Sequence, residues 1–181
     1  MRKVFTFIWE LIKIAIIAAV IVVPIRYFLF QPFFVMGQSM NPNFEQGDYL
    51  IIDEITYRFR EPQRGEVIVF KSPQDPSQRF IKRIIGLPGE TVEIKDGKIT
   101  IYKQGQTQIL DESEYLLSDL TTSGDLFVNL GEKEYFVLGD NRDFSFDSRR
   151  FGSLSKDKII GRVVFRAWPF ADLSKIGVPT Y

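Results

Sequence analysis

The feature of this sequence that most constrains its fold is an apolar run at the N-terminus. Residues 4–23 are mainly apolar, and only Glu10 and Lys13 bring charge into the run. These two residues are three positions apart, so in a helix they can pair. A helix of roughly 20 residues is about 30 Å long, which matches the hydrocarbon core of a bilayer. The run therefore predicts a transmembrane helix within an N-terminal membrane anchor of residues 1–30.

Two other interpretations compete with the anchor. A cleaved signal peptide would use Met1, Arg2 and Lys3 as its basic start, but the apolar stretch is too long and no A-x-A motif follows it. A helix buried in a soluble domain is the other alternative. Arg2 and Lys3 precede the run, and no Lys or Arg occurs between Arg26 and Arg58. This bias predicts a cytoplasmic N-terminus and an extracytoplasmic remainder.

Residues 31–181 are predicted to form one β-rich domain. Several short segments are rich in β-branched and aromatic residues, as strands are. They are residues 48–52, 66–70, 80–85, 91–94, 98–102, 134–138 and 159–168. The pair Asp96-Gly97 lies between two of these segments and predicts a hairpin. Residues 103–132 are polar and irregular, which predicts a peripheral loop or a small subdomain.

The connections between these segments indicate how the strands pair. No long amphipathic helix follows the N-terminal run, so the helices that connect parallel strands are lacking. We therefore expect a mainly β fold, with antiparallel β-sheets in a barrel-like or sandwich-like arrangement after one N-terminal transmembrane helix.

The absence of histidine and cysteine excludes several kinds of chemistry. Zinc has almost no ligands here, and neither a disulfide nor a Ser-His-Asp triad can form. Nucleotide-binding glycine motifs are missing, and a formal net charge of zero offers no basic field for nucleic acid. We expect no cofactor and no metal, although composition alone leaves open a magnesium or calcium site made only of carboxylates.

Ser39 and Lys82 are the candidate nucleophile and base. A serine nucleophile needs a base, and without histidine that base must be Lys, Asp, Glu or Tyr. Lys82 lies among apolar residues that would bury its amine, and Ser-Lys is a known variant of the triad. Two alternatives stay open on these residues alone. Ser39 could be an ordinary turn serine, and Lys82 could point outward while Arg83 points inward.

Four blocks of sequence occur in a characteristic order after the apolar run. They are Ser39-Met40, residues 64–70 (RGEVIVF), residues 82–90 (KRIIGLPGE) and residues 139–149 (GDNRDFSFDSR). With these four blocks in this order, the chain resembles a bacterial type I signal peptidase, or leader peptidase, over nearly its whole length. The resemblance implies a membrane-bound serine endopeptidase with a Ser-Lys dyad on a mostly antiparallel β fold. Such an enzyme removes signal peptides from exported preproteins at the bacterial cytoplasmic membrane, without a cofactor.

The resemblance also implies roles for single residues. Ser39 matches the nucleophile and Lys82 the general base of the family. Ser145 matches a hydroxyl that helps to hold the lysine amine, and Asp147 and Arg149 match a structural pair that supports this serine. The alternative for residues 139–149 is a charged surface loop with local turns, and Asp140 to Asp143 could do only this.

One position departs from part of the family. Some members carry a serine two residues before the nucleophile that helps to bind the oxyanion, and this chain has Gly37 there. The oxyanion hole is then expected to use the backbone N–H of Ser39, with the Gly37 amide or a water as a second donor. Val35, Val69 and Ile81 are weaker candidates for the walls of a shallow substrate pocket, and plain core packing is an equal alternative for each.

The expected partners are preprotein signal peptides and the lipid bilayer, with the protein translocation machinery as a further candidate. Phe33, Phe34 and residues 168–170 (WPF) could lie at the lipid interface or cap the core. Phe144 and Phe146 have no predicted role beyond packing or membrane contact. Two rival functions are a self-cleaving repressor-type Ser-Lys peptidase, which would need a DNA-binding module, and a non-catalytic anchored β-domain.

Overall fold

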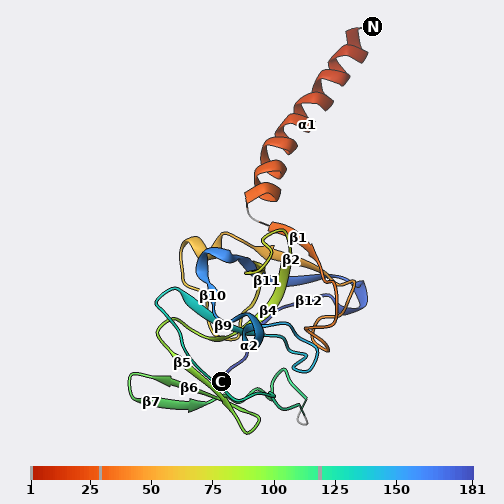
Figure 1. The fold of residues 1–181 in the computed structure, drawn as a ribbon. Coiled ribbons are helices and arrows are strands. Elements are labelled where there is room, and N and C mark those ends of the chain that lie inside the picture. The colour runs from red at the N-terminus through yellow and green to blue at the C-terminus, as the bar shows by residue number, and fades with distance from the viewer. Residues whose placement is uncertain (1, 29, 118–119) are drawn as a thin grey trace.

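A long helix leads into a β-domain in the computed structural model, which describes residues 2–28, 30–117 and 120–181, and within the helix the side chains of residues 4 and 6–20. Helix α1 (Arg2–Phe28) projects away from the domain, as Figure 1 shows. Glu10 and Lys13 pair on its surface at 2.9 Å. The described apolar side chains of α1 are exposed, among them Phe7, Trp9 and Ile16. The structure does not describe the basic side chains of Arg2, Lys3 and Arg26.

Within the described part of the chain, no helix combines the length and the apolar character needed to cross a membrane.

The larger of two sheets contains eight strands and carries most of the domain. Its order is β1-β2-β11-β3-β4-β9-β10, and β12 pairs with β11. The strands are β1 (Phe30–Phe34), β2 (Tyr49–Asp53), β3 (Val67–Lys71), β4 (Arg79–Gly86), β9 (Glu134–Leu138), β10 (Leu154–Ser155), β11 (Ile159–Trp168) and β12 (Ser174–Lys175). Short helices join some of them, namely η1 (Thr56–Arg58), α2 (Ser148–Phe151), η2 (Lys156–Lys158) and η3 (Phe170–Asp172).

A second sheet of four strands lies at the end of the domain away from α1 (Figure 1). Its order is β7-β6-β5-β8, formed by β5 (Thr91–Lys95), β6 (Lys98–Lys103), β7 (Gln106–Ile109) and β8 (Leu126–Asn129). The predicted hairpin joins β5 to β6, with Lys95 opposite Lys98. Asp96 and Gly97 have φ of 50° and 77°, the left-handed values that such a two-residue turn requires.

The prediction of a mainly antiparallel β fold is confirmed, since every strand pair between described residues is antiparallel. Each of the seven predicted strand segments overlaps an observed strand. Two regions differ from the expectation. Residues 103–132 contain β7 and β8 rather than only irregular chain: β7 is mainly polar and exposed, and β8 is mainly apolar but only four residues long. Residues 30–34 (FQPFF) form β1, which pairs with β2 and extends the large sheet.

Side chains from both sheets fill three buried apolar clusters. One cluster lies beneath the start of the large sheet and includes Val35, Met40, Val69 and Ile81. The second joins the two sheets through Ile85, Val92 and Phe136, among others. The third covers the opposite face of β3, β4 and β9. Strand β4 therefore has a covered surface on both faces, and this decides the environment of Lys82 and Arg83.

Candidate active site

Ser39 and Lys82 meet beside strand β4 of the large sheet. Ser39 lies in the turn that follows β1, and Lys82 lies in the middle of β4. The Lys82 Nζ and Ser39 Oγ atoms are 2.7 Å apart, although the residues are 43 positions apart in the sequence. This distance is that of a strong hydrogen bond, so a proton can pass directly between the two groups.

Burial adjusts the basicity of Lys82. Only 3% of the residue is exposed, and its Nζ donates a second hydrogen bond of 2.8 Å to the Ile81 carbonyl oxygen. Desolvation lowers the pKa of Lys82 from 10.5 to about 8, against the opposing effect of the Asp147 and Asp140 carboxylates. At pH 7 about a tenth of the side chains would be neutral, compared with a fraction on the order of 10⁻³ for an unperturbed lysine.

Asn141 holds the turn that carries Ser39. Its backbone N–H donates to the Ser39 carbonyl oxygen at 3.1 Å, and its side-chain Nδ2 donates to the Gln38 carbonyl oxygen at 3.0 Å. Gly37, directly before these residues, has φ of 84°, a conformation that favours glycine. The sequence assigned Asn141 only a local turn role, since nothing in residues 139–149 indicates which distant carbonyls lie within reach.

Asp147 and Arg149 form the pair that the resemblance implied. Arg149 donates from Nε and Nη2 to the two Asp147 carboxylate oxygens, each at 2.9 Å. Asp147 is fully buried, caps α2, and also accepts the Gly139 N–H at 3.1 Å. Burial raises the pKa of Asp147, but the hydrogen bonds and charge of Arg149 outweigh it, so the pKa lies below its ordinary value. The carboxylate therefore stays ionised at neutral pH.

Ser145 lies in the same buried region without the contact that was expected of it. It is 4% exposed, and among the described residues its Oγ has no hydrogen-bond partner. The Asp147 carboxylate is near, and its pKa responds to the Ser145 hydroxyl, but the geometry is not that of a hydrogen bond. The hydroxyl is thus free to turn toward another acceptor or donor.

Gly139 allows Ser145 and the turn that carries Ser39 to lie close together. A Cβ atom at this position would lie 2.2 Å from Ser145 Oγ and 2.4 Å from the Ser39 carbonyl oxygen. Real Cβ atoms do not come so close to other heavy atoms, so any side chain here would displace the Ser39 turn or Ser145.

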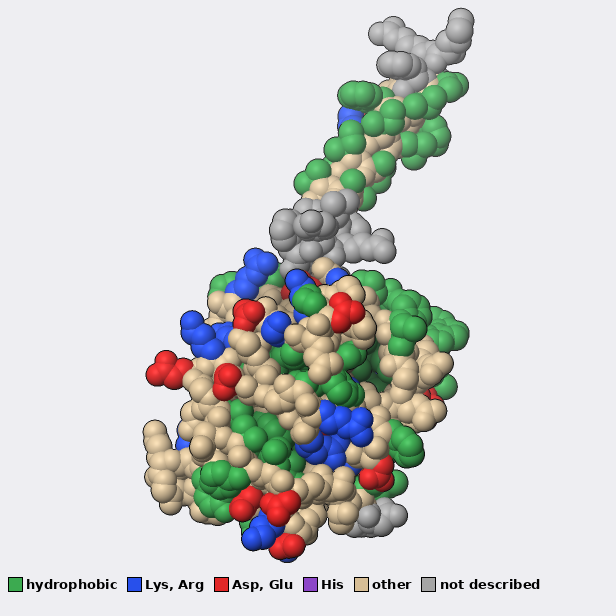
Figure 2. All heavy atoms as spheres, viewed as in Figure 1, with side chains coloured by type: hydrophobic (Ala, Val, Ile, Leu, Met, Phe, Trp, Pro, Cys, Tyr) green, Lys and Arg blue, Asp and Glu red, His purple; other side chains and the backbone are tan. Residues whose placement is uncertain are grey.

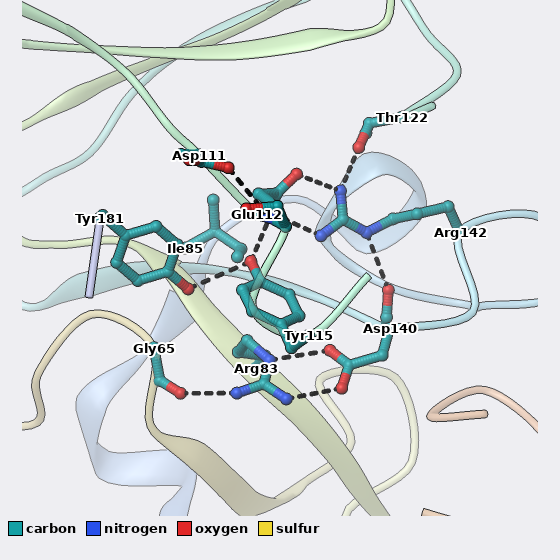
Figure 3. A network of polar contacts seen from close by, with 12 residues as sticks. Gly65, Arg83, Ile85, Asp111, Glu112, Tyr115, Thr122, Asp140, Arg142 and Tyr181 are labelled. Carbon is teal, nitrogen blue, oxygen red and sulfur yellow. Dashed lines mark hydrogen bonds and ion pairs between the residues drawn. The ribbon is translucent and has the colours of Figure 1, made fainter. Parts of the chain in front are cut away.

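Arg83 is buried as well. It forms a two-pronged ion pair with Asp140, at 2.8 Å and 2.6 Å, and donates to the Gly65 carbonyl oxygen at 3.0 Å (Figure 3). Its guanidinium stacks 4.1 Å from the centre of the Tyr115 ring. Lys82 is buried, as its apolar neighbours suggested, and the alternative of an outward Lys82 fails. Packing covers each face of the strand, so Arg83 is buried too.

The Arg83 pair continues into a wider polar network, shown in Figure 3. Arg142 donates to both oxygens of Glu112, at 2.9 Å and 2.6 Å, and to the Thr122 hydroxyl. Its Nε also donates to the Gly139 carbonyl oxygen at 3.1 Å. Asp140 and Arg142, which the sequence could not separate from surface turn residues, are instead fully buried supports of the region around Ser39.

A cleft of about 470 Å³ opens beside Ser39 and Lys82. Its walls come from the segment around β1 and from the start of β4, and its lining residues are Phe33, Phe34, Met36, Ser39, Ser77, Gln78, Arg79, Phe80, Ile81 and Lys82. Ile81 therefore lines the cleft, as predicted. Val35 and Val69 do not line it, since they lie within the apolar cluster beneath.

Phe144 and Phe146 have different environments. Phe146 packs against Phe80 and Phe151, with ring centres 6.3 Å and 5.7 Å apart, so it supports the strand that carries Lys82. Phe144 is 75% exposed. Elsewhere in the described residues, no group of three or more acidic side chains is arranged to hold a metal ion.

The chain belongs to the signal peptidase family, peptidase S26, whose family model matches residues 8–168. It is accordingly a serine endopeptidase.

Relatives with known names cover most of the chain. It is similar to a probable signal peptidase I-1 of Synechocystis sp., with 36% identity over 97% of this chain and 90% of the relative. It is also similar to a signal peptidase I of Leptolyngbya laminosa, at 37% identity over 94% and 84%, and to a signal peptidase IB of Staphylococcus aureus, at 33% over 90% of each. A crystal structure of a signal peptidase I from Enterococcus faecalis V583 aligns with 57% of this chain and 97% of its own, at 35% identity and a TM-score of 0.47.

Proposed function

We propose that the chain is a membrane-anchored signal peptidase that cleaves N-terminal signal peptides from exported preproteins with a Ser39–Lys82 dyad. The observation that carries this proposal is the 2.7 Å contact between Ser39 Oγ and the buried Lys82 Nζ. A lysine works as a base only when it is neutral, and burial is what makes the neutral form accessible near neutral pH.

The reaction follows from this pair. Ser39 Oγ attacks the scissile carbonyl carbon as its proton passes to neutral Lys82. The resulting ammonium returns that proton to the leaving amine as the C–N bond breaks, which leaves an acyl-enzyme. Lys82 then takes a proton from a water that attacks the ester carbonyl carbon, and returns that proton to Ser39 Oγ as the ester C–O bond breaks. The Ser39 N–H, with the Gly37 amide, would bind the oxyanion that forms in both steps.

Ser145, Asp147 and Arg149 would act by positioning. The buried Asp147–Arg149 pair fixes α2 and the end of the 139–149 segment. A rotated Ser145 hydroxyl could then accept a hydrogen from the Lys82 amine, whose two described contacts are Ser39 and Ile81. This would aim the amine's lone pair at Ser39.

An extended peptide fits the cleft beside the dyad. Strand β4 pairs with β3 from Arg79 to Arg83, but β9 pairs with β4 only from Arg83 onward. The other backbone edge of residues 79–82 therefore has no strand partner among the described residues, and a substrate could pair with it. Ile81 forms part of the apolar wall there, which suits the small side chains before a signal-peptide cleavage site.

Helix α1 would attach the domain to the membrane. Its described apolar side chains are exposed, and in the sequence Ile21, Val22 and Val23 continue the apolar run. Beside the cleft, Phe34 and Met36 are exposed, as are Trp168 and Phe170, whose rings pack together 4.7 Å apart. Exposed aromatic residues of this kind favour a lipid interface.

Cleavage of a preprotein by the purified full chain in detergent tests the dyad. Ser39→Ala and Lys82→Ala should each abolish cleavage, and the double variant should be hardly worse, because the two residues act as a unit. Ser113→Ala and Lys98→Ala, at exposed positions that do not line the cleft, are matched controls that should cleave normally. Normal cleavage by either dyad variant would remove that residue from the mechanism.

Protease digestion of intact spheroplasts tests the orientation. The basic Arg2 and Lys3 before the apolar run favour an extracytoplasmic domain. Added protease should then degrade the part beyond Gln31 in intact spheroplasts, with a cytoplasmic protein as the protected control. Degradation that occurs only after lysis would reverse the proposed topology.

A further inference from the structure

Three cations form a row across neighbouring strands of the large sheet. Lys71 at the end of β3 lies directly opposite Arg79 at the start of β4. Ile159 of β11 lies opposite Phe70, which brings the preceding residue, Lys158, next to Lys71 on the other side. All three side chains line one cavity of about 320 Å³. We call these residues the basic row.

The basic row makes no close ion pair with the described residues, although Glu54 and Asp157 line the same cavity. In the described part of the chain, none of its members belongs to an ion pair. Like charges directly opposite each other destabilise a sheet, so this arrangement costs stability unless an anion lies between them. The row therefore has the chemistry of an anion site that is built from the ends of three strands.

Two carboxyl groups line the same cavity, and neither pairs with the row. Asp157 accepts a hydrogen bond from the Ser155 hydroxyl. Glu54 has an Oε1 atom that is buried without a hydrogen-bond partner among the described residues. Burial raises the pKa of Glu54, and the nearby charges of Arg79 and Arg58 oppose this shift.

The position of the cavity indicates which anion it meets. Gln31 also lines it and follows Phe28, the last residue of α1, by three positions. Three extended residues span at most about 11 Å, so the cavity lies close to the end of the helix. Figure 2 shows Lys and Arg side chains, interspersed with Asp and Glu, on the part of the domain from which α1 emerges. With α1 in a bilayer, this part of the domain would lie at the level of the lipid headgroups.

We propose that Lys71, Arg79 and Lys158 bind the phosphate group of an anionic membrane lipid. This inference rests on the membrane attachment in the proposed function. Arg79 lines both the basic cavity and the cleft beside Ser39, so a lipid bound by the row would hold one end of the cleft at the membrane surface. Substrate entering from the bilayer would then meet the cleft without leaving the interface.

Acetylation of lysines in the reconstituted full chain tests the site. Vesicles of phosphatidylcholine alone are compared with vesicles that also contain phosphatidylglycerol, and mass spectrometry measures the labelling rate of each lysine. Lys71 and Lys158 should be labelled at least about threefold more slowly in the anionic vesicles. Lys95 and Lys98, in the hairpin of the far sheet, are internal controls and should not change. Equal labelling of the basic row in both vesicles would overturn the proposal.

A variant separates a bound lipid from the general surface potential. Arg79→Gln should abolish the protection of Lys71 and Lys158, whereas the exposed Arg150→Gln should keep it. Protection that survives Arg79→Gln would mean that the negative surface alone slows the reaction, and would overturn the site. If inorganic phosphate protects Lys71 and Lys158 in neutral vesicles, the row binds free anions. If an acidic precursor peptide protects them there, the row binds substrate. Either result would overturn the lipid assignment.

The same vesicles test the proposed function separately. Flotation with neutral vesicles measures attachment through α1 without any anionic lipid. Cleavage of a preprotein, and its loss in Ser39→Ala, measures the dyad. If Lys71 and Lys158 are not protected from acetylation while flotation and cleavage are normal, only the lipid site is refuted.

Discussion

Asn141 fixes the peptide group between Gln38 and Ser39 by donating from its side-chain Nδ2 to the Gln38 carbonyl oxygen at 3.0 Å. In a planar trans peptide, the C=O and N–H bonds point in opposite directions. The Ser39 N–H is therefore directed away from Asn141, and it donates to no partner among the described residues. This amide is the expected oxyanion donor, and with glycine at position 37 no side-chain hydroxyl there can replace it.

Asn141→Ala should lower kcat by about tenfold or more, because an oxyanion donor that is no longer held in place stabilises the transition state less. KM, the melting temperature and the acid limb of the pH–rate profile should stay close to those of the parent protein. Asn141→Asp should be similarly impaired, although it keeps the acceptor that receives the Phe144 N–H. Steady-state kinetics on a preprotein measure this, with Asn129→Ala in the far sheet as a control. A change confined to KM would refute the positioning role.

Gly139→Ala should both destabilise the protein and abolish cleavage. The added methyl would overlap Ser145 Oγ and the Ser39 carbonyl oxygen, and overpacking of this kind costs about 1–3 kcal/mol. Gly177→Ala is the matched control, because a Cβ there meets nothing within 4 Å and its φ lies outside the left-handed region. Thermal unfolding and preprotein cleavage can be measured on the same samples. An active, stable Gly139→Ala enzyme would contradict the packing around Ser39.

The pH dependence of kcat/KM should follow the Lys82 amine. Because the neutral form is the base, activity should rise about tenfold per pH unit in acid and level off above the Lys82 pKa of about 8. Lys82→Arg should be inactive across this range, because a guanidinium does not lose its proton there. A rise that continues to pH 10, as for an unperturbed lysine, would contradict the buried base.

Asp140→Ala should cost about 3–5 kcal/mol of unfolding free energy, because it leaves the Arg83 charge buried without its partner. Asp140 also accepts from the Asn43 side chain at 2.9 Å, so the chain just beyond Ser39 should loosen too. Lys156→Ala breaks the exposed pair with Glu61 and should cost about 1 kcal/mol or less. Equilibrium unfolding of the full chain in detergent compares the two, and equal costs would argue against a structural role of the buried pair.

Most strands could be predicted from the sequence because their residues show the pattern of a half-buried or buried strand. The exceptions have physical causes. Strand β1 is rich in Phe and directly follows the apolar helix, so it could not be told from the outer end of an anchor. Strands β7 and β8 lie at the edges of the small sheet. Strand β7 is exposed along its whole length and shows no alternation, and β8 is only four residues long, too short for its pattern to stand out.

The sequence by itself determined the chemistry available to this protein. It excluded histidine-based catalysis, it supplied the Asp96-Gly97 turn, and the order of its motifs indicated the family. Only the tertiary structure decided which groups meet. Strand β4 is covered on both faces, so Lys82 and Arg83 are both buried, and the partner of each comes from a distant segment: Ser39 for Lys82, Asp140 for Arg83. Local pattern cannot contain this information, because burial and pairing depend on how non-adjacent strands and loops pack together.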